Sequence, residues 1–395
     1  MTTGMQHTIV ERARELVPII RAASDEIENT CRIPDHLDTA LEDAGLYQLY
    51  LPEAYGGPQV DPLSATQAIE EISKSDGSTG WVCMIGTVLS RRYAWMNPDI
   101  VQAMQTESGS LRAAGSNRAL GYAQVEENGY LVNGRWDFQS GIEHASWMFG
   151  NCILLDGEEP ILNDKHQPLT RVMAVPITSG NIIDTWDVIG LRGTGSSDFE
   201  LTSVHVPIER SVPQGAAFEG PDPPVIEGLL YKQRFSGVWN QTVHAGCALG
   251  IARGALEEFR QLSSTHASTM QSTSLRERPF VQNKMGEAEA LLRSARTYLF
   301  DAIAETWEIA SEQHADPSDK IANLRLAITH AGNEAVRAVD LVFQAAGTNA
   351  AHTANRLERY FRDSHVTAQH GAAAPRNYEA AGRVFLGLPA GLGGW

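Results

Sequence analysis

The sequence has only four cysteines and lacks the spacings that bind metals. Cys31, Cys83, Cys152 and Cys247 lie far apart and form no CxxC pair. A disulfide-rich secreted domain or a cysteine-ligated metal centre would need cysteines in closely spaced sets. We therefore expect free thiols, a reducing compartment and no metal site.

Long apolar runs are missing as well. No segment approaches the ~18 apolar residues that a membrane-spanning helix needs. The first residues, MTTGMQHTIVERARELVPII, have no long apolar stretch followed by a small-residue cleavage site, as a secretory signal peptide would. We expect a cytoplasmic protein that does not associate with a membrane.

Positive charge is in the minority. Lys and Arg number 31 against 48 Asp and Glu, a formal net charge of −17 at pH 7, and there is no run of basic residues. The resulting field repels polyanions, so nucleic acid and anionic membranes are not expected as partners. The chain has 395 residues, 43% of them hydrophobic. This length indicates two or three packed units rather than one compact core.

Common catalytic and nucleotide-binding motifs are absent too. The segment LRGTGSSD at 191–198 has neither the GxGxxG nor the GxxxxGK[ST] spacing. The chain also lacks HExxH and GxSxG, the motifs of zinc proteases and of α/β-hydrolases. A Rossmann or P-loop nucleotide site and a nucleophile-type hydrolase are therefore not expected.

What the sequence does contain is a change of periodicity along the chain. Residues 1–110 have helical spacing, residues 111–226 alternate with a period of two, and residues 227–395 are helical again. In the middle region, Asn128-Gly129 and Asn133-Gly134 are typical of hairpin turns between short strands. This order predicts three domains with these boundaries: an N-terminal helical domain, a small β domain and a C-terminal helical bundle.

Four segments in this frame resemble the acyl-CoA dehydrogenase superfamily. They occur in the family's order along nearly the whole chain: LYLPEAYGG at 49–57, NGYLVNGRWDFQSG at 128–141, IGLRGTGSSDFELTSVHVP at 189–207 and RYFRDSHVTAQHG at 359–371. The resemblance implies a mainly α protein with a central β-barrel domain between an N-terminal helical domain and a C-terminal four-helix bundle. It also implies a homotetramer in which the bundle of one subunit touches its neighbour's flavin.

The family's flavin contacts transfer to matching positions of this chain. The resemblance places Ser140 at the flavin N5 edge and Phe138 against the ring system. Hydroxyls and an Arg around a reduced flavin supply hydrogen bonds and charge without titrating near neutral pH. The full set implied for cofactor binding is Trp81, Phe138, Ser140, Arg192, Thr194, Ser196, Gln344 and Gly347, the last two facing the neighbour's cofactor.

The family's catalytic base is missing. Acyl-CoA dehydrogenases need a carboxylate beside the flavin to remove a proton next to the thioester carbonyl. At the distance after Arg362-Asp363 where the family has a Tyr-Glu pair, this chain has His370-Gly371. The alternative base position, on the first bundle helix, lies in YKQRFSGVWNQTVHAG at 231–246, which has no Asp or Glu. Dehydrogenation of an acyl thioester is therefore not expected.

A branch of the family that shares this loss is the oxygenase component of two-component flavin monooxygenases. This chain resembles it in SGxxHAxW at 140–147 and in the Arg-Asp-x-His-x-x-x-x-His pattern at 362–370. The resemblance implies reduced FAD or FMN delivered by a separate NAD(P)H-dependent flavin reductase, O2 as co-substrate and a C4a-hydroperoxyflavin. It also implies hydroxylation of a small, electron-rich aromatic substrate that is phenol- or indole-like.

Three residues are candidates for the chemistry. Ser140 matches the hydroxyl that holds the flavin N5 proton. His370 is a candidate to give or take a proton, because an imidazole titrates near neutral pH. His144 matches the branch pattern, and it either takes part in catalysis or orders the contact between the β domain and the bundle.

Three further residues are candidates for substrate binding: Leu89, Arg91 and Trp239. Leu89 stands near the position where hydroxylases of this branch often carry a second His. Its presence favours an indole-like ring over a simple phenol, or an acidic substrate held by Arg91 or Arg92. Trp239 lies on the first bundle helix.

Other functions stay open at this point. A dehydrogenase would need another carboxylate, such as Glu227 or Glu379, in the site. Oxygenation of a nitrogen or sulfur atom is a further activity that this fold hosts. The chain would otherwise be a catalytically inactive member that serves in binding or assembly.

Overall fold

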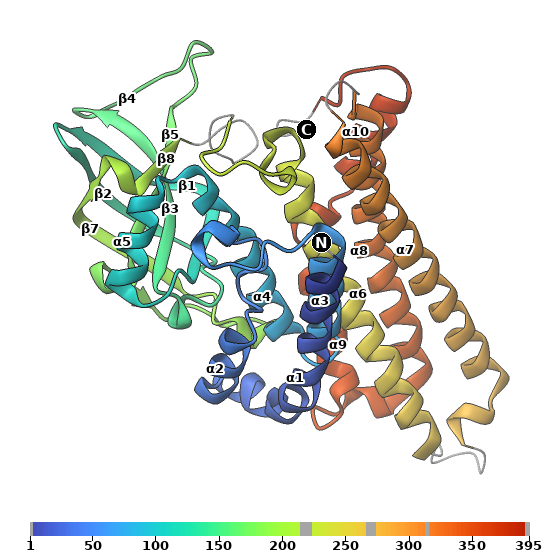
Figure 1. Cartoon of the computed structure of the whole chain (residues 1–395). Helices are drawn as coiled ribbons and strands as arrows, with labels where there is room; N and C mark the ends of the chain where they lie inside the picture. Colours follow the sequence, from blue (N-terminus) through green and yellow to red (C-terminus); the bar gives the residue numbers. More distant parts are fainter. Residues whose placement is uncertain (1–2, 214–222, 266–273, 313–315, 392–395) are drawn as a thin grey trace.

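The computed structural model describes residues 3–213, 223–265, 274–312 and 316–391. Helices form both ends of the chain and strands the middle (Figure 1), as the change of periodicity predicts. The N-terminal helices are α1 (Thr3–Thr30), α2 (Asp35–Asp43), α3 (Pro62–Ser73), α4 (Gly77–Ser90) and α5 (Pro98–Ser108).

The described strands form one sheet with the order β6-β7-β2-β1-β3-β5-β8, and β4 pairs with β3. Most neighbours are antiparallel, whereas β1 and β3 are parallel. The strands are β1 (Ala113–Glu126), β2 (Gly129–Trp136), β3 (Trp147–Asp156), β4 (Glu159–Pro160), β5 (Thr170–Pro176), β6 (Asn181–Ile183), β7 (Asp198–Pro207) and β8 (Ser211–Pro213).

The sheet is open, so the prediction of a β-barrel is wrong. Closing it would require β6 to pair with β8, and the described strands show no such pairing. Both edge strands are only 3 residues long. Pro213, the last residue of β8 that the structure describes, has no N–H to donate. Within the described residues, the two edge strands therefore do not pair with each other.

One of the two predicted hairpin turns is present and the other is wrong. β1 and β2 are joined by a tight turn that includes Asn128, and Gly129 begins β2. Asn133 and Gly134 instead lie inside β2, where Gly134 pairs with Gly121 of β1. A Cβ at Gly134 would lie 2.6 Å from the Cα of Gly121. The glycine therefore allows two strands to approach closely rather than forming a turn.

The C-terminal helices are α6 (Gln233–Thr265), α7 (Pro279–Ser311), α8 (Ser318–Ala346), α9 (Arg356–Thr367) and α10 (Arg376–Phe385). In Figure 1 the long helices α6, α7 and α8 lie on the side away from the sheet, and α3 and α4 lie between the two. α4 packs against both β1 and α6. Among the helices that the structure describes, none has the length and apolar character needed to span a bilayer.

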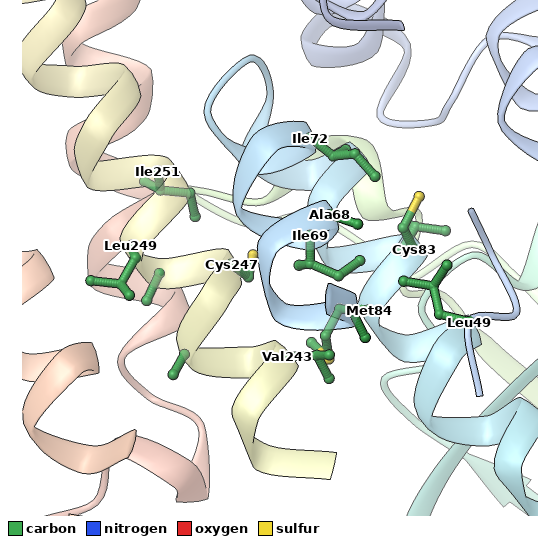
Figure 2. Close-up of a cluster of buried hydrophobic side chains, with 14 of the residues drawn as sticks. Leu49, Ala68, Ile69, Ile72, Cys83, Met84, Val243, Cys247, Leu249 and Ile251 are labelled. Carbon is green, nitrogen blue, oxygen red and sulfur yellow. The ribbon is translucent and has the colours of Figure 1, made fainter. Parts of the chain in front are cut away.

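α3, α4 and α6 meet in one buried hydrophobic cluster. Figure 2 shows Ile69 of α3, Met84 of α4 and Val243 of α6 gathered in it. Burying such side chains stabilises the fold by about 1.5–3 kcal/mol each. α3 and α4 can approach closely because Gly80 of α4 has no side chain. A Cβ at this position would lie only 1.8 Å from Ser73 Oγ of α3.

α4 runs antiparallel to α6, and its start is fixed by capping. Asp76 accepts a hydrogen bond from the Thr79 N–H over 2.7 Å, which satisfies a free donor of the first turn. The Gly77 carbonyl lies 4.0 Å from the Cys247 thiol. One turn further along α4, the Trp81 ring lies 5.4 Å from the ring of His244, which precedes Cys247 on α6. This register determines which side chains of the two helices meet.

Candidate functional site

A row of hydrogen-bonded hydroxyls lies between α4 and the segment that precedes β7. Trp81 Nε1 donates to Ser140 Oγ over 3.2 Å. Ser140 Oγ lies 2.7 Å from Ser196 Oγ, which lies 2.7 Å from Thr194 Oγ1. Thr194 Oγ1 donates to the Leu191 carbonyl over 2.8 Å. We call these five residues the hydroxyl row.

The turn at 191–195 is built to hold this row. Leu191 and Gly195 flank a short 3-10 turn with φ of 53° and 50°, a left-handed conformation that is uncommon for leucine. Buried Asp363 of α9 accepts from the Leu191 N–H over 2.6 Å and so supports the turn. A Cβ at Gly193 would lie 2.0 Å from Ile27 Cγ2 of α1, so only glycine allows this packing.

Two histidines stack beside the row. The rings of His244, on α6, and His370 lie 4.3 Å apart with an angle of 26° between their planes. Trp81 meets both rings edge-on, at 5.4 Å and 5.8 Å. We call His244 and His370 the imidazole pair. Trp81 therefore joins the hydroxyl row to the imidazole pair.

Hydrogen bonds assign the position of each imidazole proton. His370 Nδ1 accepts from the Ala372 N–H over 3.2 Å, so a neutral His370 carries its proton on Nε2. His244 Nε2 lies 3.2 Å from the Thr367 carbonyl, which only accepts, so this nitrogen is protonated. His370 therefore presents an N–H donor rather than a free lone pair.

Both imidazoles are neutral at pH 7. Burial lowers the pKa of His244 well below its usual range, and the neighbouring His370 lowers it further. The surrounding protein lowers the pKa of His370 to about 4. The His370 residue is nonetheless exposed in the single chain, and solvent opposes this lowering of its pKa.

Large apolar side chains next to the row are exposed. Phe138 is 57% exposed and packs edge-on against Trp186, with 5.9 Å between the ring centroids. Ile189 is 70% exposed. Exposed apolar surface beside a hydrogen-bonding hydroxyl such as that of Ser140 suits a flat ring system with a polar edge.

In the described part of the chain, no carboxylate forms a hydrogen bond or ion pair with Ser140 or His370. Glu227 and Glu379, the carboxylates considered for a dehydrogenase, are both exposed. Asp363 is buried, which raises its pKa to about 7, but its carboxylate is bound to the turn at Leu191.

The structure brings together five residues predicted from the sequence: Trp81, Ser140, Thr194, Ser196 and His370. The first four share the hydroxyl row, and His370 joins them through its ring contact with Trp81. These residues come from four segments of the chain that are far apart in sequence. The fold brings their hydroxyl, indole and imidazole groups together at one site.

Two other predicted residues are held in different surroundings. His144 Nδ1 lies 3.6 Å from Asp38 Oδ2 of α2. Arg192 donates from Nη2 to Cys31 Sγ over 3.2 Å and from Nη1 to the Val188 carbonyl over 3.1 Å. These contacts connect each side chain to its structural neighbours, and neither side chain hydrogen-bonds to the hydroxyl row.

The three candidates for substrate binding lie in the core. Leu89, Arg91 and Trp239 are 3%, 2% and 0% exposed. The Arg91 guanidinium lies over the Trp95 ring at 5.2 Å, and Trp239 stacks with Phe235 at 5.8 Å. In the single chain these three side chains are therefore packed against the protein interior.

Gln344 and Gly347 lie far along α8, at its C-terminal end. Both residues are exposed. Gly347 has φ of 59°, and its N–H donates to the Gln344 carbonyl to cap the helix. Within the single chain they take no part in the hydroxyl row or the imidazole pair.

Two residues of the site were not among those predicted. His244 lies in the stretch 231–246, which has no Asp or Glu. Its imidazole, in the stretch that carries the family's alternative base, is the sequence signal for this position. Trp186, which packs against Phe138, carries no signal in a single sequence, since an isolated Trp in a loop resembles any other.

Family models match both helical parts of the chain. The acyl-CoA dehydrogenase N-terminal domain matches residues 3–96, and the acyl-CoA dehydrogenase C-terminal domain matches residues 242–375. The chain belongs to the acyl-CoA dehydrogenase family. The fold is accordingly acyl-CoA dehydrogenase-like, with the strands between two helical parts in the order of the chain, and the resemblance to this family is confirmed.

Within the acyl-CoA dehydrogenase family, the chain is similar to named oxygenases. It is 28% identical to the indole-3-acetate monooxygenase of Acinetobacter baumannii, over 93% of this chain and 91% of the relative. It is 29% identical to the flavin-dependent monooxygenase oxygenase subunit HsaA of Rhodococcus jostii, over 96% and 98%. The crystal structure of the 3-HSA hydroxylase from Rhodococcus sp. RHA1 matches with a TM-score of 0.84 and 28% identity, covering 97% of this chain and 98% of that one.

Proposed function

We propose that this chain is the oxygenase component of a two-component flavin-dependent monooxygenase. It takes reduced FAD or FMN from an NAD(P)H-dependent reductase and uses O2 to hydroxylate a small, electron-rich aromatic compound that is phenol- or indole-like. One observation carries the proposal: Ser140 and a neutral His370 meet at Trp81, where a dehydrogenase of this family needs a carboxylate. The names of the relatives support the same reaction.

The residues around the hydroxyl row fit a flavin. Phe138 and Ile189 offer exposed apolar surface, and Ser140 offers a polar contact at its edge. Ser196 and Thr194 hold Ser140 in place. A bound reduced flavin supplies the electrons that activate O2, which no side chain supplies. The protein contributes binding, orientation and the exclusion of water.

We assign to His370 the role of a hydrogen-bond donor. Its Nδ1 is occupied by the Ala372 N–H, and its low pKa keeps the ring neutral. Nε2–H is therefore the group it offers to an oxygen of the substrate or of the reacting oxygen species. His244 stacks on the ring and holds its orientation.

A wall for the substrate lies along one face of α4. Ile85 and Val88 follow Trp81 at helical spacing, and all three are partly buried against the core. Because α4 and α6 run antiparallel, the face of α4 that bears Ile85 and Val88 is directed toward Asn240, which lies one turn before His244 on α6. Among the described residues, Asn240 Oδ1 is buried without a hydrogen-bond partner. Asn240 therefore suits a substrate N–H or O–H, with the ring lying on the apolar side chains.

We further propose that four copies assemble and that the protein works in the cytoplasm. Gln344 and Gly347 are exposed in the single chain, as residues that meet a neighbour's cofactor must be. The four cysteines, all within the described residues, are free thiols, which is usual in a reducing compartment.

The direct test is a stopped-flow experiment. Protein with photoreduced FMN or FAD is mixed with oxygenated buffer, with and without indole-type and phenol-type substrates. We expect a long-lived absorbance band distinct from those of reduced and oxidised flavin, followed by hydroxylated product. Immediate reoxidation without such a band, or bleaching of bound oxidised flavin by an acyl-CoA, would contradict the proposal.

Ser140→Ala tests the place of the hydroxyl in this reaction. Without Ser140, the oxygen-bearing state loses a hydrogen bond, so we expect it to decay at least about tenfold faster and to release H2O2 in place of product. The matched control is Ser294→Ala, which removes an exposed hydroxyl from α7. Unchanged coupling between flavin oxidation and product in Ser140→Ala would show that Ser140 lies outside the site.

A further inference from the structure

The hydroxyl row has a direction that follows from counting protons. Contacts of 2.7, 2.7 and 2.8 Å join the oxygens of Ser140, Ser196, Thr194 and the Leu191 carbonyl. Two oxygens at such a distance need a proton between them, because two bare lone pairs repel. The three hydroxyls supply one proton for each contact, and the carbonyl supplies none.

The carbonyl therefore sets the direction of the whole row. Thr194 gives its proton to the Leu191 carbonyl, Ser196 gives its proton to Thr194, and Ser140 gives its proton to Ser196. Trp81 Nε1 in turn donates to Ser140. Ser140 is left without a proton for any ligand and presents only a lone pair.

We propose that this direction makes the site select reduced over oxidised flavin. The inference rests on the proposed function and on Ser140 lying at the N5 edge. N5 of a reduced flavin carries a hydrogen, which it donates to Ser140. N5 of an oxidised flavin carries a lone pair, which would face the lone pair of Ser140. The first contact is a hydrogen bond, and the second leaves two acceptors unsatisfied.

Ser196 and Thr194 are positioning residues in this proposal. Neither has to touch the flavin, because each acts by keeping the Ser140 proton turned away from it. The three side chains are 6% (Ser140), 3% (Ser196) and 1% (Thr194) exposed, so water does not compete for their protons. Asp363 holds the far end of the row through the Leu191 N–H.

The test measures the affinity of oxidised and of photoreduced FMN and FAD under anaerobic conditions, together with the midpoint potential of the bound flavin. We expect the unaltered protein to bind the reduced form at least about tenfold more tightly. Ser196→Ala and Thr194→Val each free the Ser140 proton to turn toward N5. The ratio of the two affinities then falls about tenfold, and the midpoint potential falls by about 30 mV.

Thr185→Val is the matched control. Its hydroxyl donates to Asp198 Oδ1 over 2.8 Å at an exposed position outside the row, so the ratio should not change. Equal weakening of both flavin forms by Ser196→Ala and Thr194→Val would mean a merely structural role and overturn the proposal. So would an equal drop of the ratio in Thr185→Val. If the unaltered protein binds both flavin forms equally, the proposed selection for reduced flavin is refuted but the proposed function is not. If the protein binds neither form, the proposed function is refuted as well.

Discussion

Asp363 lies buried beneath the site, and Asp363→Asn is expected to change how the stability of the protein depends on pH. Burial raises the pKa of Asp363 to about 7, with Asp76 and Glu28 nearby adding to the effect. In an unfolded chain the pKa of an aspartate is about 3.9. The folded state therefore binds the proton more tightly than the unfolded state.

The sign and size of the effect follow from proton linkage. Stability contributed by protonated Asp363 is present below pH ~4 and is lost as the pH rises toward the folded pKa. Between pH 5 and pH 8 these two pKa values correspond to a loss of about 2–3 kcal/mol. Asn does not titrate, and its side-chain oxygen still accepts from the Leu191 N–H. Between pH 5 and pH 8, the unfolding free energy of Asp363→Asn should therefore rise by about 2–3 kcal/mol relative to that of the unaltered protein.

The assay is urea unfolding of both proteins at several pH values, with the difference in unfolding free energy as the readout. Other titrating groups contribute equally to both proteins and cancel in the difference. Infrared spectra of the native proteins supply an independent measure, because the band of a protonated carboxyl group should titrate near pH 7 and be missing from Asp363→Asn.

The control is Asp43→Asn, at an exposed aspartate near the end of α2. Its stability difference should stay constant across the same pH range. A difference for Asp363→Asn that varies by less than about 0.5 kcal/mol would show that burial does not shift this carboxyl group. The buried support of the turn at Leu191 would then be an ordinary ionised aspartate.

Three further predictions concern the turn, the imidazole pair and the substrate wall. Gly193→Ala should lower the free energy of unfolding by about 1–3 kcal/mol, because the added methyl group overpacks against Ile27. Gly286→Ala, on α7 with open space around it, should raise the free energy of unfolding by about 0.5–1 kcal/mol. Thermal unfolding measures both changes. Product formation should show no inflection from His370 between about pH 5.5 and 8, because its lowered pKa keeps it neutral; an inflection near pH 6.5 that His370→Gln removes would contradict this. Asn240→Leu should raise the substrate KM about tenfold with little change in kcat, and an unchanged KM would place the substrate elsewhere.

Much of the hydroxyl row was predictable, because each of its polar side chains sits in a motif that resembles the family. Ser140 follows β2, and Thr194 and Ser196 precede β7, so short local patterns identify them. The imidazole pair was only half predictable. His370 stands out as a missing base, while His244 becomes meaningful only when α6 brings it into contact with His370.

The proposed substrate wall could not be predicted in detail from the sequence, because the side of a helix that faces a site depends on packing. Successive residues on a helix are rotated by about 100°. Leu89 was predicted to face the substrate and lies in the core, while its neighbour Val88 lies on the partly buried face with Trp81. A shift of one position is therefore enough to move a side chain from the partly buried face to the core.

The sequence by itself determined the order of helices and strands, the family and the loss of the carboxylate base at His370. Those features depend on local periodicity and on which residue types are present. Only the tertiary structure decided that the sheet stays open, that two imidazoles stack and that the hydroxyls form a row with one direction. Each of these depends on distances between segments far apart in the chain, and a proton is assigned to a hydroxyl only when the oxygens on both sides of it are known.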